Sequence, residues 1–205
     1  MAATREYQRK TENVLVAAEE LFLRRGYAET SMQAVADHAG VAKATVYSNF
    51  PNKDALFEAV VVRRAECNKV DIDHIDLESG EVHATLVELA VSFLFDIYSR
   101  EQLELFRTVV ADARRFPHLG KMMLEGPFRE THGKIREYFT RLVRQGELTL
   151  TDPDMAVEYF LAIIKADKHV KLLFNQDVNI APRTIRTIAD GAVDIFLNGA
   201  RPRTL

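Results

Sequence analysis

The first helix signal is a stripe of apolar positions near the N-terminus. Residues at i, i+3, i+4, i+7 and i+8 are apolar there, namely Val14, Ala17, Ala18, Leu21 and Phe22. This is the spacing of one face of an α-helix, so it predicts a helix over about residues 8–24. Arg24 and Arg25 fall in its last turn, where cations complement the helix dipole, and Gly26 ends it.

Two short helices are predicted next. Thr30 and Gln33 have the spacing of a capping box, in which a hydroxyl and an amide satisfy backbone donors at a helix start. The second helix, which they open, ends at Gly40 after two turns. A third helix is predicted over 42–49 and is ended by Pro51. Short helix, turn and short helix in this order are typical of a helix-turn-helix unit.

Longer helices are predicted in the rest of the chain. Asn52 is expected to cap a fourth helix that runs from 53 to about 69. After a charged break at 71–80, the predicted helices are 81–98, 101–115, 118–125, 127–146, 153–174 and 182–198. No segment alternates with period two between turn residues, so no strands are predicted.

The predicted fold class is therefore all-α. A small N-terminal helix-turn-helix domain is expected at 1–53, followed by a linking helix at 53–70. A helical bundle is expected at 71–205.

The charge distribution leaves a nucleic-acid role open. The formal net charge of −3 argues by itself against a nucleic-acid binder. Residues 1–53, however, hold seven basic and six acidic side chains, so that this part carries +1 and the remainder −4. The sign permits a DNA-facing N-terminal module on an acidic body, although random variation along the chain explains so small a difference equally well.

Composition favours a cytoplasmic protein without membrane contact. The longest apolar stretch, Leu86–Phe95, is interrupted by Glu88 and is shorter than the ~18–20 residues that cross a bilayer. The N-terminus has no apolar signal core. Cys67 is the single cysteine, which excludes an intrachain disulfide and a multi-cysteine zinc site and suits a reducing compartment.

Residues 17–57 resemble the DNA-binding domain of TetR-type transcriptional regulators. The segment reads AAEELFLRRGYAETSMQAVADHAGVAKATVYSNFPNKDALF. The matching landmarks are Gly26-Tyr27, Thr30-Ser31, Ala39-Gly40-Val41, Thr45-Val46-Tyr47, Phe50, Lys53 and Leu56, together with the Ala-Ala…Leu-Phe stripe. The resemblance implies that the third predicted helix is a recognition helix that enters the major groove of double-stranded DNA.

The DNA-contacting residues implied by the resemblance are Thr30, Ser31, Gln33, Lys43, Ala44, Thr45, Tyr47, Ser48 and Lys53. The ammonium groups of Lys43 and Lys53 suit phosphates, as does the Tyr47 hydroxyl, whereas Thr45 and Ala44 suit base edges. The alternative is that Thr30, Asn52 and Tyr47 only cap or pack a small helical domain.

Two positions depart from the family pattern. Ala42 stands where a Ser or Thr commonly caps the recognition helix, and the missing hydroxyl should cost ~1 kcal/mol of helix-start stability. Ala44 replaces a frequent Gly and should slightly stiffen the helix. Both changes leave the operator sequence open.

The C-terminal part resembles the AefR-like branch of the same family at residues 105–119, 125–130 and 146–160. That resemblance implies a ligand between helices and a homodimer formed by the last two helices. An apolar stripe along these helices is the expected dimer interface: Phe160, Ile164, Ile185, Ile188, Ala189, Ala192, Ile195 and Phe196. Burial of the same stripe within one subunit is the alternative.

A ligand pocket is expected among aromatic and thioether side chains of the bundle. The candidates are Phe93, Tyr98, Phe106, Met122, Met123, Phe128, Tyr159 and Asp167. Such side chains also serve as ordinary core residues. Asp167 has Lys171 one turn later, and an i, i+4 ion pair is favoured over a ligand-orienting role.

The sequence gives little support for an enzyme or for a metal site. A di-iron bundle needs two Glu-x-x-His pairs, and the sequence has one acid-x-x-His pair, Asp71 with His74. Phosphate-binding glycine loops and nucleophile motifs are absent from the sequence. We expect a non-enzymatic dimeric regulator without cofactor or metal, most simply a repressor that an unknown small-molecule effector releases from a palindromic operator. A regulator without effector, or a helical small-molecule-binding protein or enzyme, are the alternatives.

Overall fold

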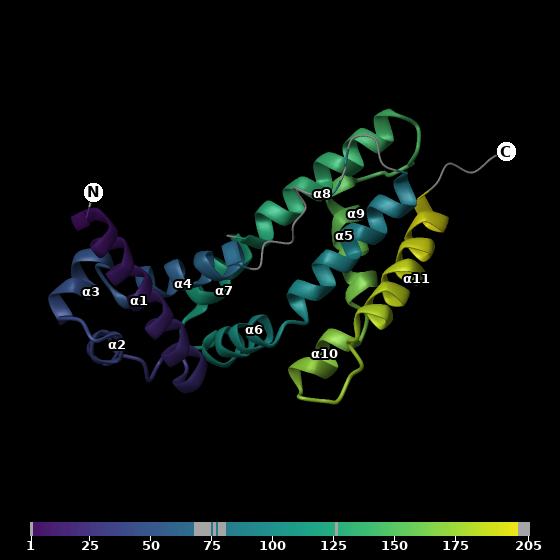
Figure 1. Cartoon of the computed structure of the whole chain (residues 1–205). Coiled ribbons are helices and arrows are strands. Elements are labelled where there is room, and N and C mark those ends of the chain that lie inside the picture. Colours follow the sequence, from purple (N-terminus) through teal and green to yellow (C-terminus); the bar gives the residue numbers. More distant parts are fainter. Residues whose placement is uncertain (1, 68–74, 76, 78–80, 126, 201–205) are drawn as a thin grey trace. The chain divides into compact units, whose positions relative to one another are not determined.

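The computed structural model of the chain describes residues 2–67, 75, 77, 81–125 and 127–200. Its regular elements there are all helices (Figure 1): α1 Ala2–Arg25, α2 Met32–Ala39, α3 Lys43–Asn49, α4 Lys53–Cys67, α5 Val82–Ile97, α6 Arg100–Asp112, α7 Pro117–Glu125, α8 Pro127–Arg144, α9 Pro153–Lys165, α10 Lys168–Leu173 and α11 Pro182–Ala200. The all-α prediction is confirmed.

The chain divides into two compact units. Unit 1 comprises residues 1–67 and 104–127, and unit 2 comprises 68–103 and 128–205. The sequence assigned 104–127 to the C-terminal domain, but this segment, which holds most of α6 and all of α7, packs with α1–α4. The division into a DNA-binding part at 1–53 and a ligand-binding part at 71–205 stays a prediction about function.

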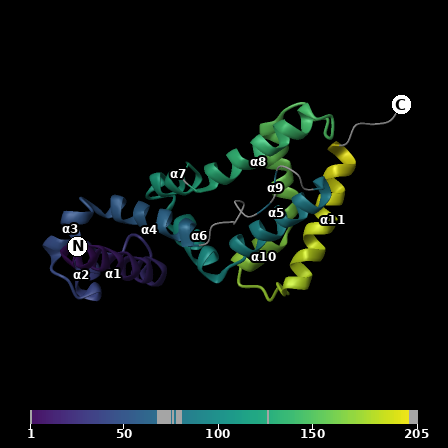
Figure 2. The same cartoon turned by 45° about the horizontal axis from the view of Figure 1, so that its top comes forward.

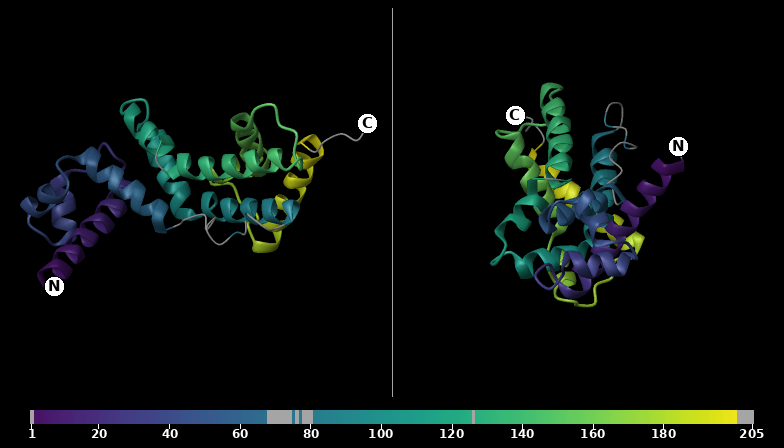
Figure 3. Two further views of the ribbon diagram at one scale, coloured as in Figure 1. Left: turned by 90° about the horizontal axis from the view of Figure 1, so that it is seen from above. Right: turned by 90° about the vertical axis from the view of Figure 1, so that its left-hand side faces the viewer.

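Unit 1 is built on the N-terminal stripe that the periodicity identifies. Its members on α1 are buried: Val14, Ala17, Ala18, Leu21 and Phe22. Helices α1–α4 gather around one another (Figure 3, left, purple and blue), and Val35 of α2, Val46 of α3 and Phe57 of α4 are buried there. The rings of Phe22 and Phe57 meet edge to face with centroids 5.0 Å apart, a favoured aromatic geometry.

Unit 2 has its core between α5, α8, α9 and α11. Helices α5, α9 and α11 pack against one another (Figure 2), and α5 is apolar on most of its circumference because it lies inside the bundle. The ring of Phe196 on α11 stacks on Phe139 of α8 at 5.2 Å and meets Phe160 of α9 at 5.1 Å. These three aromatic side chains tie the C-terminal helix to the centre of the unit.

The prediction of one continuous helix over 153–174 is wrong, because the observed helix breaks at Ala166. That residue has φ 46° and ψ −148°, and α10 begins two residues later. A continuous helix would use the Lys165 carbonyl as the acceptor for the amide of His169. In the structure the Tyr98 hydroxyl donates to this carbonyl at 3.0 Å. No glycine or proline marks the break, so local sequence signals could not reveal it.

Candidate nucleic-acid interface

Helices α2 and α3 form a helix-turn-helix around Gly40. This residue has φ 66° and ψ 34°, a left-handed conformation that favours glycine. Its amide donates to the Asp37 carbonyl and the amide of Val41 to the Ala36 carbonyl, which is the bonding pattern of a Schellman motif. Val46, on the inner side of α3, is fully buried. The turn therefore fixes the direction of α3, and Val46 fixes its rotation.

The outer side of α3 presents the side chains that the sequence assigned to DNA. Lys43, Ala44, Tyr47 and Ser48 are exposed, and we call these four residues the recognition face. The ammonium of Lys43 lies 5.8 Å from the centre of the Tyr47 ring, whose residue is 45% exposed. Thr45, predicted to read bases, is half-buried. A cation, a phenol and a hydroxyl thus lie together on one solvent-facing helix side.

A pair of polar side chains anchors α3 to α1. Asn49 donates through Nδ2 to the Thr45 carbonyl at 2.7 Å, and its Oδ1 accepts from the Thr11 hydroxyl at 3.0 Å. Sequence reasoning missed this contact because the two residues lie 38 positions apart. The anchor holds the end of the recognition helix opposite the uncapped Ala42.

The start of α2 differs from the prediction. Ser31, not Thr30, is the N-cap, and its Oγ accepts from the amide of Ala34 at 3.1 Å. Thr30 is 2% exposed, and its hydroxyl donates to the carbonyls of Leu21 and Gly26 at 3.2 and 2.8 Å. The structure therefore corrects the predicted DNA contact of the Thr30 side chain. This hydroxyl instead links the end of α1 to the start of α2 inside the unit.

Ser31 and Gln33 remain at the surface. Both are exposed, and Gln33 donates through Nε2 to Asp37 at 2.8 Å on the same helix. The capping box predicted for Thr30 and Gln33 is wrong, since Gln33 turns toward Asp37 instead of back to the helix start. A reciprocal box needs Glu or Gln three residues after the cap, and because Ser31 is the cap that position is held by Ala34.

Lys53 lies where the sequence placed it, at the start of α4, but its ammonium is not free. It donates to the carbonyls of Tyr27 and Ala28 at 2.9 and 3.3 Å. It also lies 4.3 Å from the centre of the Tyr27 ring. Burial lowers its pKa. These bonds close the loop between α1 and α2, and the phosphate contact predicted for this side chain stays a prediction.

The same loop is held by residues that sequence reasoning did not single out. Asp112, at the end of α6, accepts through Oδ2 from the amide of Tyr27 at 2.8 Å and from that of Ala28 at 3.3 Å. The Tyr27 hydroxyl donates to Asp54, and His118 of α7 lies with Nε2 3.1 Å from the same Asp54 Oδ1. Segment 112–118 therefore belongs to the structural frame of the helix-turn-helix.

Charge and burial shape the acid–base behaviour of this cluster. The hydrogen bond from Tyr27 holds the pKa of Asp54 below its ordinary value, and His118 adds to the effect. Burial, together with the bond to Asp54, raises the pKa of Tyr27. The phenol accordingly stays protonated and the carboxylate stays charged at neutral pH, which is the state that preserves the bond.

The predicted dimer stripe is largely a core stripe. Within one subunit Phe160, Ile164, Ile185, Ala189, Ala192 and Phe196 are buried in unit 2. This burial fits the alternative for these six residues, and a contact of any of them with a second subunit stays a prediction. Ile188 is half-buried and Ile195 is 65% exposed. The small residues at the centre of the stripe allow close approach of α5 and α9 to α11.

The predicted pocket residues divide between the two units. Phe93 and Tyr98 are buried in the core of unit 2, whereas Met123 is buried in unit 1, to which Phe106 and Met122 also belong. Tyr159 is exposed. The side chain of Phe128 lies outside the described residues. A single pocket made of this whole set stays a prediction, because aromatic composition does not reveal which core a residue joins.

Asp167 forms the ion pair that its spacing indicates. Its Oδ2 lies 2.5 Å from the Lys171 Nζ at an exposed position at the start of α10. Lys171 holds the pKa of this carboxyl below its ordinary value. A pair of this kind contributes little stability because solvent screens it.

The described helices carry neither a clear metal site nor a single membrane span. No group of three or more His, Cys, Asp or Glu in the described part of the chain could hold a metal ion. Asp71 and His74, the pair weighed as a metal site, lie outside the described residues. No single described helix is long and apolar enough to span a membrane; only α5 and α6 taken together have the length and composition.

Family models cover most of the chain. The model of "Bacterial regulatory proteins, tetR family" matches residues 14–60. The model of the "AefR-like transcriptional repressor, C-terminal domain" matches residues 84–199. The second match alone spans more than half of the sequence.

Individual proteins agree with the two models. YvkB of Bacillus subtilis, an HTH-type transcriptional regulator, is 25% identical over 121 residues, which are 55% of this chain and 62% of that protein. The chain thus spans less than two thirds of that relative. The solved structure of the flavonoid-responsive regulator FrrA matches with a TM-score of 0.84 and 28% identity over 96% of this chain and 100% of that one. A TetR-family regulator from Mesorhizobium loti matches with a TM-score of 0.83 and 26% identity over 96% and 98% of the chains.

Proposed function

This chain belongs to the TetR family of transcriptional regulators, and we propose that it binds double-stranded operator DNA through the recognition face of α3. The observation that carries the proposal is the joint exposure of Lys43 and Tyr47 on one side of α3, while Val46 of the same helix is buried. A helix of this shape with its polar side outward fits the major groove, in the manner of helix-turn-helix proteins.

Each side chain of the interface has a role that follows from its chemistry. Lys43 supplies a point charge and Tyr47 a hydroxyl, and both suit phosphate oxygens at the groove rim. Ala44 offers a methyl group and Ser48 a hydroxyl to the base edges, and the half-buried Thr45 reaches them only with part of its side chain. Ser31 stands at the start of α2, where backbone amides attract a further phosphate. The Thr30 side chain supports this surface from inside, and Lys53 holds the loop that precedes α2.

Operator binding is proposed for a homodimer. Members of the family act as dimers, and two copies related by a two-fold axis read a pseudo-palindromic site. After six stripe residues are assigned to the core, the exposed apolar positions on the two neighbouring helices α9 and α11 remain for the partner. They are Met155, Tyr159 and Ile195. Their exposure supports an interface on the outer sides of α9 and α11.

Regulation is proposed to be repression relieved by a small molecule. An effector that prefers the subunit arrangement unable to bind DNA shifts the population away from the operator, with a coupling of ~1–3 kcal/mol in typical cases. The bonds from Asp112 and His118 support this mechanism, because they join α6 and α7 to the α1–α2 loop and to α4, which flank the helix-turn-helix. A constitutive regulator, without an effector, is the second candidate.

The test is a DNA titration with two variants. Labelled DNA from the region upstream of the protein's own gene is titrated with wild-type protein, Lys43→Ala and Tyr47→Phe, and binding is followed by fluorescence anisotropy. We expect each variant to weaken binding by about tenfold or more per dimer, since each removes a phosphate contact from both subunits.

The control is Lys121→Ala, which removes an exposed cation of α7 away from the recognition face. It lowers the net charge by the same amount as Lys43→Ala, so it measures the general electrostatic effect. Equal losses in Lys43→Ala and Lys121→Ala would contradict the assignment of α3 as the DNA-reading helix.

A further inference from the structure

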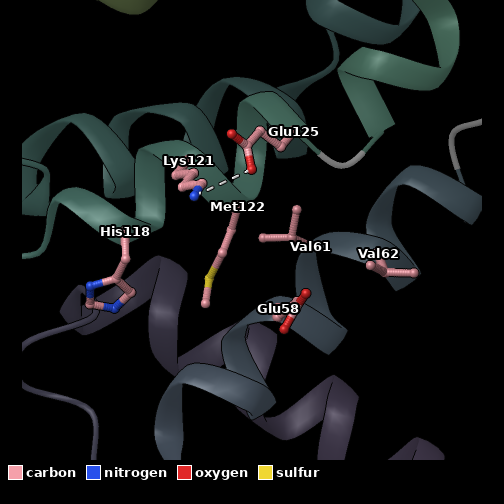
Figure 4. A pocket seen from close by; sticks show the side chains of 7 residues that line it. All are labelled: Glu58, Val61, Val62, His118, Lys121, Met122 and Glu125. Atoms are coloured by element: carbon pink, nitrogen blue, oxygen red, sulfur yellow. Dashed lines mark ion pairs between the residues drawn. The ribbon is translucent and has the colours of Figure 1, made fainter.

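A groove separates α4 and α7 within unit 1 (Figure 4). Its volume is about 390 Å³, and it is lined by Glu58, Val61 and Val62 of α4 and by His118, Lys121, Met122 and Glu125 of α7. These residues recur at helical spacing on each helix, so that one side of α4 faces one side of α7. Cavities that hold small molecules begin at roughly 300 Å³, which makes this groove large enough for a compact ligand.

The groove has an apolar floor. Val61 is 4% exposed, and the Met122 side chain extends from α7 toward α4 between His118 and Val61 (Figure 4). A thioether is flexible and polarisable, so Met122 can adapt its shape to an occupant. The floor therefore favours a ligand with an apolar body.

The rim of the groove is acidic. Glu58 on α4 has no ion pair with any residue that the structure describes. Glu125 on α7 is paired with Lys121 of its own helix at 3.8 Å, and both side chains of this pair are more than half exposed. A pair so exposed is weak, and a ligand cation can take the place of Lys121. Two carboxylates against one ammonium leave a net negative rim.

We propose that this groove binds a small organic cation with an apolar body, such as an arylalkyl ammonium ion. The ammonium lies against Glu58 and Glu125, and the hydrocarbon part replaces water over Val61 and Met122. Charge complementarity at the rim and apolar area on the floor both select this class over neutral and anionic molecules of equal size.

Occupation of the groove reaches the DNA-binding frame through His118. Its ring lines the groove, and its Nε2 lies 3.1 Å from Asp54 in the first turn of α4. A ligand body between the helices moves α7 against α4 and so displaces the His118 ring from Asp54. The consequence for DNA rests on the proposed function, whereas binding in the groove does not.

The test uses three ligands with one hydrocarbon body: phenylbutylamine, phenylbutanol and phenylbutanoate. Full-length protein with carbon-13-labelled methionine methyl groups is titrated with each, and the Met122 methyl resonance, assigned by Met122→Leu, reports the dissociation constant. Met155, an exposed methionine of unit 2, is the internal control. We expect a saturating shift at Met122 alone and an affinity for the amine about three- to fivefold above that for the alcohol.

A charge variant tests the rim. Glu58→Gln is expected to remove most of the preference for the amine while leaving the alcohol affinity unchanged, because only the ammonium contact is lost. Glu137→Gln, which removes an exposed carboxylate of α8, is the matched control and should leave the preference intact. Equal affinities for amine and alcohol in the wild-type protein, tighter binding of phenylbutanoate, or no shift at Met122 would overturn the proposal.

DNA binding is measured separately, with and without saturating phenylbutylamine. A fall in operator affinity for wild type but not for Glu58→Gln supports the groove as an effector site. If Met122 reports binding while operator affinity is unchanged, the groove assignment is supported and its regulatory role is overturned. Failure of wild-type protein to bind any upstream DNA contradicts the proposed function and leaves the Met122 result standing.

Discussion

The ammonium of Lys53 donates to the backbone carbonyl of Tyr27 at 2.9 Å while lying 4.3 Å from the centre of the Tyr27 ring. One side chain thus binds both the main chain and the aromatic side chain of the same residue. Since Tyr27 also bonds to Asp54 in the first turn of α4, residues 53 and 54 together clamp the loop between α1 and α2. This clamp determines where α2 begins and so where the helix-turn-helix lies on α1.

The first prediction concerns the stability of this clamp. Lys53→Ala leaves the carbonyls of Tyr27 and Ala28 without their charged donor, and a bond of this kind contributes ~1–3 kcal/mol. We expect the free energy of unfolding, measured with urea, to fall by about this amount. Lys43→Ala is the control, because an exposed position away from packing should change stability by no more than ~0.5 kcal/mol. The reverse ranking would show that Lys53 acts at the surface.

The second prediction concerns pH. The folded-state pKa of Asp54 is lowered, chiefly by the Tyr27 hydroxyl, so its contribution to stability is complete above the ordinary carboxyl pKa of about 4 and is lost as pH falls through the lower folded value. We expect Tyr27→Phe to raise the pKa of Asp54 toward its ordinary value, which carboxyl carbon NMR measures directly. Asp54→Asn should flatten the decline of stability in the acid range.

A matched variant keeps this pH prediction specific. Tyr98→Phe also removes the hydroxyl of a buried tyrosine, but this hydroxyl donates to the Lys165 carbonyl rather than to a carboxylate. It should leave the pKa of Asp54 unchanged. An unchanged Asp54 pKa in Tyr27→Phe itself would show that His118 or the helix start, rather than the phenol, sets the value.

The recognition unit could be predicted from sequence because its signals are local. Gly40 needs a left-handed turn, Val46 needs a buried position, and Ala42 offers no side-chain cap, and the structure has all three features. The four-residue distance between Lys43 and Tyr47 likewise places them on one side of any helix. Each of these inferences depends only on spacing within a dozen residues.

The remaining contacts could not be predicted because they join distant segments. Asp112 lies 85 positions from Tyr27, and the pattern of α6 gives no reason to pair its last residue with the α1–α2 loop. Similarly, an apolar stripe such as that of α11 shows that a helix is buried on one side but not whether the cover is the same subunit or another. Phe196 and Ile195 are adjacent in sequence, yet the first is buried and the second is exposed.

The third prediction restores the family's missing cap. Ala42 is the N-cap of α3 and makes no side-chain hydrogen bond there. Ala42→Ser supplies a hydroxyl for the free amides of the first turn and should raise the free energy of unfolding by ~1 kcal/mol. Ala44→Ser is the matched control: the same chemical change inside the helix costs a few tenths of a kcal/mol, roughly the difference in helix propensity. Thermal and urea denaturation of the two variants should therefore move in opposite directions.

The fourth prediction separates the two neighbouring residues of α11. Ile195→Glu puts a charge on the exposed side of the helix that we propose for the dimer, so sedimentation equilibrium should show dissociation with little loss of monomer helicity. Val110→Glu, the same type of change at another exposed apolar position, should leave the dimer intact. Phe196→Ala opens a cavity among Phe139 and Phe160 and should cost ~3–5 kcal/mol of stability in the folded unit. A dimer that persists in Ile195→Glu would place the subunit contact elsewhere, because a buried carboxylate facing its own symmetry mate is not tolerated in an apolar interface.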